Sequence, residues 1–370
     1  MEKFLQKIFK SISYFLFSQI YGKIEKYIDS SNDNRIKIDT VNIEQKLKYK
    51  IYKISEGRLY TDRIHDTAVM LNNSIIKGPS FQLRYEDSKI YNSKVTDNIV
   101  FTKGTPRILK KLNGKTLSLL TGGAGNSNYW HWLFDVLPRI ALCNKIIDLK
   151  KIDYFLLPNL FEKFQKETLD SLDIPKNKRL SSKKFRHIKT EELIVTDHPV
   201  VVTGDTSKDI QNIPSWIIFW LKKSFVKNTI KNKENKNKIY IDRKDSRHAS
   251  ERLISNEDEV KKYLLKNDFI SVNLSEIKFL DQVDLFFNAE CVVGLHGAGF
   301  ANTVFCEPGT KVVELRGLNA GPVIENLAKT NNLNYHSIIV EAKQIQKFSY
   351  PNQQGSIQIP IETLGKILEN

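Results

Sequence analysis

The spacing of apolar residues predicts three kinds of structure along the chain. Over residues 1–30, apolar and aromatic side chains recur every three or four positions, which predicts one amphipathic helix. Residues 35–115 read as short strands and turns. From residue 117 onwards, short apolar runs alternate with longer segments of helical period. That alternation predicts α/β structure with parallel sheets.

Individual elements follow from this pattern in two series. The first series has helices at residues 129–147 and 161–172, and strands at 117–120, 154–157 and 193–196. The second has helices at 256–266 and 279–288, and strands at 239–242, 269–272, 291–293 and 311–315. A helix at 214–230 and a polar, lysine-rich stretch at 231–238 separate the two series.

The chain therefore divides into four predicted segments. These are an N-terminal helix (residues 1–30), a first α/β domain (31–213), a helix with a linker (214–238) and a second α/β domain (239–370). Two such domains that face each other would form a ligand cleft between them.

The first predicted helix is basic as well as apolar. Its lysines are Lys3, Lys7, Lys10, Lys23 and Lys26. A basic helix that is rich in aromatic residues can lie in the surface of a membrane. It can equally pack against the body of its own protein. The sequence leaves both alternatives open.

Composition narrows the class of partner. The chain has 370 residues, 41% of them hydrophobic, and a net charge of +15. These values describe a globular protein suited to anionic substrates or to an anionic membrane surface. A nucleic-acid partner is not expected, because the chain has no run of aromatic residues interleaved with arginine that could stack on bases.

Cysteine content points to a reducing compartment. Cys143, Cys291 and Cys306 lie in apolar or helical contexts without paired spacing, which predicts buried thiols. No compact apolar run precedes a small-residue cleavage site, and no segment reaches the roughly 18 apolar residues that a membrane span needs. We expect a cytoplasmic protein, peripheral at the inner face of the cell membrane if its first helix binds lipid.

A glycine-rich segment is the strongest candidate for ligand binding. Gly294, Gly297 and Gly299 surround His296 directly after a predicted buried strand. Backbone N–H groups near Gly297, Ala298 and Gly299 could approach a phosphate there, at the start of a helix. The spacing is not the dinucleotide pattern G-x-G-x-x-G, because Asn302 stands where its third glycine would be. A purely geometric turn is the alternative.

Arginines gather after another predicted strand end. Arg243, Arg247 and Arg252 lie within ten residues, beside His248, in a chain whose basic residues are mostly lysine. Arginine binds diphosphate in a bidentate manner, so this cluster predicts an anion site rather than a solvated loop. Glu314, on the strand after the glycines, could accept ribose hydroxyls or could be a surface charge.

A histidine and an aspartate form the candidate catalytic pair. His131 and Asp135 are four residues apart on a predicted helix, so they share a face. An aspartate there orients the imidazole and stabilises its charged form, as a histidine base requires. The helix follows a second glycine-rich turn at residues 121–127. The alternative is a histidine bonded locally in an aromatic core.

Several motifs are missing from the sequence. The chain contains no Asp-x-Asp, no G-x-x-x-x-G-K-[ST] and no zinc-type spacing of His and Cys. We therefore expect neither a bound metal nor a cofactor.

Taken together, three motifs resemble the glycosyltransferase family 61 catalytic domain. They are residues 130–135 with Pro138-Arg139, residues 240–244 with Arg252, and residues 294–299 continuing through Asn302 to Glu314. The resemblance covers about residues 115–320. It implies a GT-B architecture of two Rossmann-like domains, nucleotide-sugar donors, inversion at the anomeric carbon and independence from metal. Within the family, the resemblance implies the bacterial type that takes part in capsular polysaccharide synthesis.

The leading hypothesis is an inverting glycosyltransferase of bacterial capsular or surface polysaccharide synthesis. It moves a sugar from a nucleotide sugar, bound by the second domain, to a glycan or lipid-linked glycan beside the first domain. His131 acts as the base with Asp135, and His296 joins the arginines and glycines at the nucleotide, with the base role as its alternative. The rival hypotheses are a nucleotide-dependent oxidoreductase and a basic protein that binds polyanions or membranes.

Overall fold

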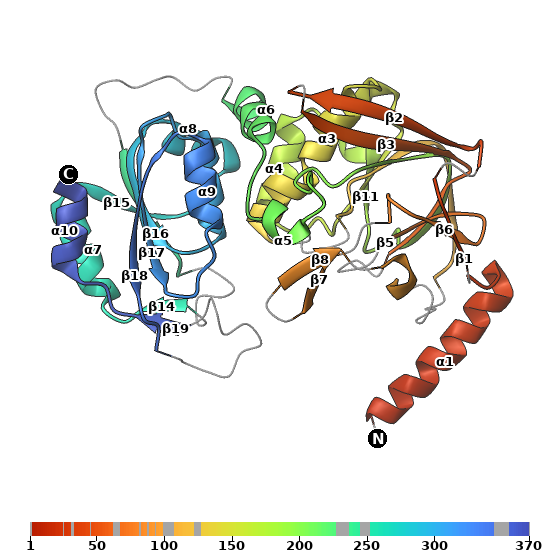
Figure 1. Ribbon diagram of the computed structural model, residues 1–370, viewed down its shortest axis with the longest axis horizontal. Helices are drawn as coiled ribbons and strands as arrows, with labels where there is room; N and C mark the ends of the chain where they lie inside the picture. The colour runs from red at the N-terminus through yellow and green to blue at the C-terminus, as the bar shows by residue number, and fades with distance from the viewer. Residues whose placement is uncertain are drawn as a thin grey trace. The chain divides into compact units, whose positions relative to one another are not determined.

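A computed structural model gives the fold of the chain (Figure 1). The structure describes residues 2–24, 26–30, 33–44, 46–61, 67–80, 83–86, 89–92, 94–98, 107–121, 127–226, 237–244, 252–343 and 355–369. The chain divides into two compact units, Met1–Ile210 and Gln211–Asn370, and each is described by itself. Most of the linker predicted at 231–238 lies outside the described residues, as do residues 122–126 of the first glycine-rich turn.

The first unit is built on a mixed sheet with strand order β1-β6-β5-β4-β12-β9-β10-β11, to which β3 and then β2 are added beside β12. Its strands are β1 (Lys26–Ile28), β2 (Ile36–Ile43), β3 (Leu47–Ser55), β4 (Arg58–Thr61), β5 (Thr67–Leu71), β6 (Ser74–Ile76), β9 (Lys110–Ser118), β10 (Tyr154–Leu157), β11 (Arg179–Ser181) and β12 (His187–Thr196). A separate hairpin pairs β7 (Leu83–Glu86) with β8 (Lys89–Asn92).

Strand direction in this sheet differs between the N-terminal strands and the later ones. β9, β10, β11 and the paired part of β12 run parallel, but β2 to β6 join the sheet through antiparallel pairs. The parallel pairing predicted from residue 117 onwards is therefore confirmed for β9, β10 and β12, and no direction was predicted for the short strands within residues 35–115. Connections of only a few residues, such as the one between β2 and β3, can join only antiparallel neighbours.

The N-terminal helix is shorter than predicted. α1 spans Glu2–Tyr21, and Gly22 follows with a φ of 77°, in the left-handed region where helices commonly end. Residues 26–28 form β1, which pairs with β6, so the predicted helix over 1–30 is wrong in its last part. No helix in the described part of the chain is both long and apolar enough to cross a membrane.

Helices of the first unit cover its sheet and carry the candidate base. They are α2 (Tyr129–His131), the π-helical segment η3 (Trp132–Val136), α3 (Pro138–Asn144), α4 (Lys163–Ser171) and α5 (Thr206–Asp209), with short 3-10 turns η1 (Val95–Asp97), η4 (Leu149–Lys151) and η5 (Lys176–Lys178). The single helix predicted over 129–147 is thus interrupted by a π segment, and α3 ends at Asn144.

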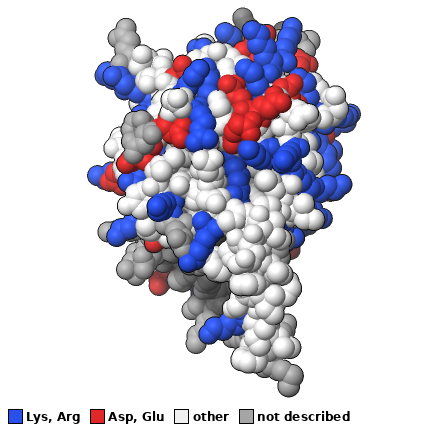
Figure 2. All heavy atoms as spheres, turned by 90° about the vertical axis from the view of Figure 1, so that its right-hand side faces the viewer, with Lys and Arg blue, Asp and Glu red and all other residues white. Residues whose placement is uncertain are grey.

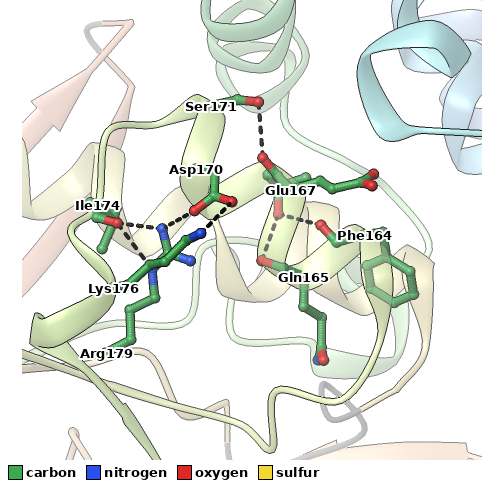
Figure 3. A network of polar contacts seen from close by, with 9 residues as sticks. Phe164, Gln165, Glu167, Asp170, Ser171, Ile174, Lys176 and Arg179 are labelled. Atoms are coloured by element: carbon green, nitrogen blue, oxygen red, sulfur yellow. Dashed lines mark hydrogen bonds and ion pairs between the residues drawn. The ribbon is translucent and has the colours of Figure 1, made fainter.

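A network of hydrogen bonds and ion pairs holds α4, which lies next to the π-helical segment (Figure 3). Asp170 at the end of α4 pairs with the guanidinium of Arg179, with 2.7 Å between Oδ1 and Nη2. Earlier on the helix, Thr168 accepts a hydrogen bond of 2.9 Å from the indole N–H of Trp132. This bond ties the segment that carries His131 and Asp135 to a helix that is itself held in place.

The second unit contains a five-stranded sheet that is parallel throughout, in the order β15-β13-β16-β17-β18. Its strands are β13 (Asn237–Asp242), β15 (Phe269–Asn273), β16 (Ala289–Leu295), β17 (Lys311–Gly317) and β18 (Asn334–Val340), and a small parallel pair adds β14 (Arg252–Ile254) and β19 (Gly355–Ile357). The four strands predicted here are confirmed. β18 is additional, because its mixed polar and apolar residues hide the pattern.

Helices cover both faces of this sheet (Figure 1). They are α6 (Ser215–Phe225), α7 (Glu257–Lys266), α8 (Phe279–Phe287), the 3-10 helix η7 (Ala298–Phe305), α9 (Val323–Thr330) and α10 (Ile361–Glu369). α7 and α10 pack on one face through apolar residues such as Val260, Leu264 and Leu364. On the other side, Phe225 of α6 lies 4.8 Å from Phe279 of α8, measured between ring centroids. α6 therefore packs within the second unit.

All three cysteines are free and buried, which confirms the predicted burial. Burial raises the pKa of the thiols of Cys143 and Cys291 to about 12. These thiols are therefore protonated and unreactive near neutral pH. The reducing, cytoplasmic compartment stays a prediction.

Candidate functional site

The glycine turn, residues 294–299, lies at the carboxyl end of the parallel sheet. A Cβ atom added to Gly294 would lie 3.1 Å from Cβ of Ile241, and one added to Gly299 would lie 3.1 Å from Cγ2 of the same residue. Contacts this close leave no room for a side chain without movement of Ile241 on β13. Both glycines thus permit the chain to leave β16 close against β13 and to enter η7 at once.

Two arginines converge on this turn. The Nη1 atom of Arg243 donates to the carbonyl of His296 at 2.6 Å, and Nη1 of Arg252 donates to the same carbonyl at 3.2 Å. A Cβ on Gly297 would lie 3.0 Å from Nη1 of Arg243. Both arginines are partly exposed as residues. The structure thus brings Arg243 and Arg252 together with the glycine turn, whereas Arg247 and His248 lie outside the described residues.

The position of these arginines follows from strand order. β13 is the first strand of the sheet, β15 lies on one side of it and β16 on the other. Counted along the chain, the order is 2-1-3-4-5, the flavodoxin-like doubly wound order. In such sheets the crevice at the carboxyl ends of strands 1 and 3 is where ligands bind. Arg243 directly follows strand 1, and the turn around Gly297 directly follows strand 3.

His296 is held by a buried carboxylate. Its Nδ1 atom forms a short hydrogen bond with Oε1 of Glu314, and the hydroxyl of Tyr335 donates to Oε2 of the same residue. Glu314 is fully buried, and His296 is nearly so. The alternative that Glu314 is a surface charge is therefore wrong. Its contact with ribose stays a prediction, although both carboxylate oxygens are bonded inside the protein. Tyr335 was not predicted, since it lies on the strand that the sequence pattern hides.

Asn302 and Ala298 occupy different environments on η7. Asn302 is fully buried, and its amide donates to Oε1 of Gln282 on α8 at 3.0 Å. In this position it joins two helices under the turn. Ala298 is the first residue of η7 and is partly exposed, so this helix begins three residues before the start expected at Ala301.

The histidine–aspartate pair of the first unit is present as its spacing predicts. Nδ1 of His131 lies 2.6 Å from Oδ2 of Asp135. The side chain of His131 is 31% exposed, whereas that of Asp135 is only 8% exposed. A carboxylate acceptor requires the proton on Nδ1, which leaves Nε2 as the basic nitrogen of the neutral ring. The arrangement can therefore take a proton from a bound hydroxyl.

Two further buried residues surround Asp135. Nε of Arg139 donates to the carbonyl of Asp135 at 3.0 Å, and its Nη1 donates to the carbonyl of Thr196 at 3.0 Å. His198, on the segment after β12, places Nε2 3.9 Å from Oδ2 of Asp135. Arg139 belongs to the first sequence motif, and its place four residues after Asp135 could have indicated this contact. His198 carries no local signal, since the sheet alone brings it close.

Burial and charge shift the pKa values of the two histidines in opposite directions. Burial alone would lower the pKa of His131, but the charge and hydrogen bond of Asp135 outweigh it and raise that pKa. Burial lowers the pKa of His198 to about 4, despite the nearby carboxylate. Burial alone would raise the pKa of Asp135, but its interactions with the neighbouring side chains, chiefly the charge and hydrogen bond of His131, lower it. Asp135 is thus ionised and His198 neutral at physiological pH.

Metal-binding clusters are not evident in the described ranges, where no three His, Cys, Asp or Glu side chains gather in a way that could hold an ion. Charge near the glycine turn is supplied by the guanidinium groups.

Comparison with known families gives the class of the protein. The family model for Glycosyltransferase 61 matches residues 129–313, which is half of the chain. The chain belongs to this family. No curated protein matches it. The glycosyltransferase 61 match includes the histidine–aspartate pair, Arg243, Arg252 and the glycine turn, and it ends one residue before Glu314.

Membership of glycosyltransferase 61 identifies the chain as a glycosyltransferase, with a sugar donor and a glycan acceptor as its partners. The family match therefore favours the glycosyltransferase over the two rival hypotheses, the oxidoreductase and the polyanion binder. The match spans parts of both units, so each unit contributes residues that the family model includes.

Proposed function

We propose that the protein is an inverting, nucleotide-sugar-dependent glycosyltransferase. The proposal rests on one observation. Arg243, Arg252 and the glycine turn come together at the carboxyl ends of strands 1 and 3 of the 2-1-3-4-5 sheet, where such sheets bind ligands. Guanidinium groups and backbone N–H groups at that point suit a diphosphate. The GT-B arrangement of the two units is part of the same proposal.

The second unit would bind the donor and stabilise its leaving group. The diphosphate lies against Gly297, Ala298 and Gly299, with Arg243 and Arg252 on its oxygens, and Arg247 is proposed to join them. As the bond between the anomeric carbon and the diphosphate oxygen breaks, negative charge grows on that oxygen. Fixed positive groups already in position stabilise this charge without rearranging. His296, held by its bond to Glu314, shapes the glycine turn. Asn302 stabilises the helix that follows the turn through its bond to Gln282.

The first unit would activate the acceptor. Nε2 of His131 removes the proton of the attacking hydroxyl while the oxygen forms its bond to the anomeric carbon. The new bond forms on the face opposite the leaving diphosphate, so the configuration inverts. Asp135 holds the ring through Nδ1 and stabilises the imidazolium that forms. Arg139 and His198 act on this step only through Asp135, as positioning residues.

A thermal-shift panel with UDP, GDP, CMP and ADP tests the donor assignment. One nucleoside diphosphate should stabilise the protein selectively, by about 2.7 kcal/mol at a hundred times its dissociation constant. A protein that responds to none of the four, while NAD(P) stabilises it, would overturn the proposal. The cytoplasmic setting and the capsular or surface-polysaccharide pathway belong to the proposal and need an identified acceptor.

A further inference from the structure

The N-terminal helix exposes a continuous apolar stripe. Eight large apolar side chains of α1 are between 42% and 65% exposed: Phe4, Leu5, Ile8, Phe9, Ile12, Phe15, Leu16 and Ile20. With 3.6 residues per turn, they fall within an arc of about 160° and extend over about 24 Å of helix. Figure 2 shows this helix in the lower part of the view as a column of uncharged atoms.

The stripe is exposed although the helix is firmly anchored. Phe17 is buried and stacks on the ring of His187, with 5.6 Å between centroids. The hydroxyl of Tyr21 accepts a hydrogen bond of 2.8 Å from the backbone of Leu109. Phe17 and Tyr21 project from the side of the helix nearly opposite the stripe. Packing on the first unit therefore uses one side of α1 and leaves the other apolar side uncovered.

Charge on the helix favours one kind of partner. Lys7 and Lys10 are exposed and lie on the side away from the stripe. The side chains of α1 that the structure describes include these lysines and no carboxylate. An apolar face with aromatic residues, opposed by a basic face, is the pattern of a helix that lies in the plane of an anionic bilayer surface. The net charge of +15 adds long-range attraction to such a surface.

We propose that α1 docks the protein on an anionic lipid surface, with the stripe among the acyl chains and Lys7 and Lys10 at the phosphate headgroups. The helix lies along the surface, and its C-terminal end, fixed by Phe17 and Tyr21, sets the orientation of the first unit against the lipid. This inference goes beyond glycosyl transfer and does not depend on it.

Vesicle co-sedimentation tests the proposal with matched variants. The full chain should bind vesicles of phosphatidylcholine and phosphatidylglycerol in equal parts, and bind pure phosphatidylcholine less. Leu5→Glu with Leu16→Glu should weaken binding about tenfold or more. Leu265→Glu with Leu280→Glu is the control, since these leucines are 72% and 48% exposed on α7 and α8. The control should bind like the wild type.

A second pair of variants tests the charge. Lys7→Gln with Lys10→Gln should weaken binding to the anionic vesicles and reduce its dependence on salt. Lys176→Gln with Lys208→Gln removes two lysines whose side chains are 83% and 82% exposed elsewhere, and should do neither. Failure of the wild type to bind either vesicle would overturn the proposal. So would a wild-type dimer that the Leu5/Leu16 variant converts to a monomer, because the stripe would then join two copies.

Discussion

Each of the two units contains a histidine bonded through Nδ1 to a carboxylate, yet the pairs differ in origin and exposure. His131 and Asp135 lie one turn apart on the same helical segment, and the imidazole is 31% exposed. His296 directly follows β16, Glu314 lies within the neighbouring strand β17, and the imidazole is 7% exposed. An accessible histidine can exchange a proton with substrate. For the buried one, whose carbonyl also accepts from two arginines, we propose that it shapes the turn that binds the nucleotide.

The largest effect is expected at the exposed pair. His131→Ala should lower the rate of sugar transfer by about 10²–10⁴-fold, because it removes the proton acceptor. The melting temperature should fall as well, because the buried carboxylate of Asp135 loses its partner, so rates are compared at a temperature at which the variant is folded. Initial rates at saturating donor and acceptor give the answer. A variant that keeps nearly full turnover would show that another group is the base.

Asp135→Asn sharpens the same point through pH. The charge of Asp135 raises the pKa of His131, and the variant loses that charge. A base works when it is unprotonated, so the acid limb of the rate profile should move to lower pH in Asp135→Asn. An unchanged limb would mean that His131 does not control the rate.

The buried histidines of the first unit predict how stability depends on pH. Burial lowers the pKa of His187 and of His198 to about 4, below the unfolded value of about 6.5. Each therefore stabilises the fold above pH 6.5, and this contribution is lost as the pH falls towards 4. Each shift corresponds to about 3 kcal/mol. His131 does not oppose this trend, because a raised pKa gives stability that is complete below the unfolded value.

Urea unfolding at several pH values checks this expectation. The unfolding free energy should fall steeply between about pH 6.5 and pH 4.5, and His198→Gln should flatten that slope. Equal stability at both ends of the range would contradict the neutral, buried state of these histidines.

The two arginines that bond to the carbonyl of His296 should matter for nucleotide binding. Arg243→Ala and Arg252→Ala should each weaken binding of the nucleoside diphosphate by about 1.5–3 kcal/mol, the usual worth of a hydrogen bond to a charged group. Because both also donate to the carbonyl of His296, a modest loss of thermal stability should accompany the change. Arg35→Ala is the control, since Arg35 pairs with Asp33 on the first unit. Calorimetric affinities equal to the wild type in both variants would refute the diphosphate site.

The smallest effect is expected from chelation. The sequence lacks Asp-x-Asp, and arginines can neutralise the diphosphate, so transfer should survive EDTA. Loss of activity on chelation, with recovery in Mn²⁺ or Mg²⁺, would show that a metal takes part.

The features that could be predicted from the sequence are those that depend on residues close together in the chain. The i,i+4 spacing gave the bond between His131 and Asp135, and apolar runs located β10 at its observed ends. Contacts across the sheet had no such signal. The bonds of Glu314 to His296 and Tyr335, and the approach of His198 to Asp135, depend on strand order. Short strands were expected where β2 to β6 lie, but their antiparallel pairing was not predicted, because pairing direction depends on connections rather than on periodicity.

One measurement tests the division of roles directly: calorimetric affinity for the nucleoside diphosphate that the panel selects, in His131→Ala and His296→Ala. Melting temperatures identify any variant that fails to fold, and His296→Asn then replaces His296→Ala. We expect His131→Ala to bind like the wild type, and His296→Ala to bind about tenfold more weakly or worse. Equal losses in both variants, or wild-type affinity in His296→Ala, would contradict the account.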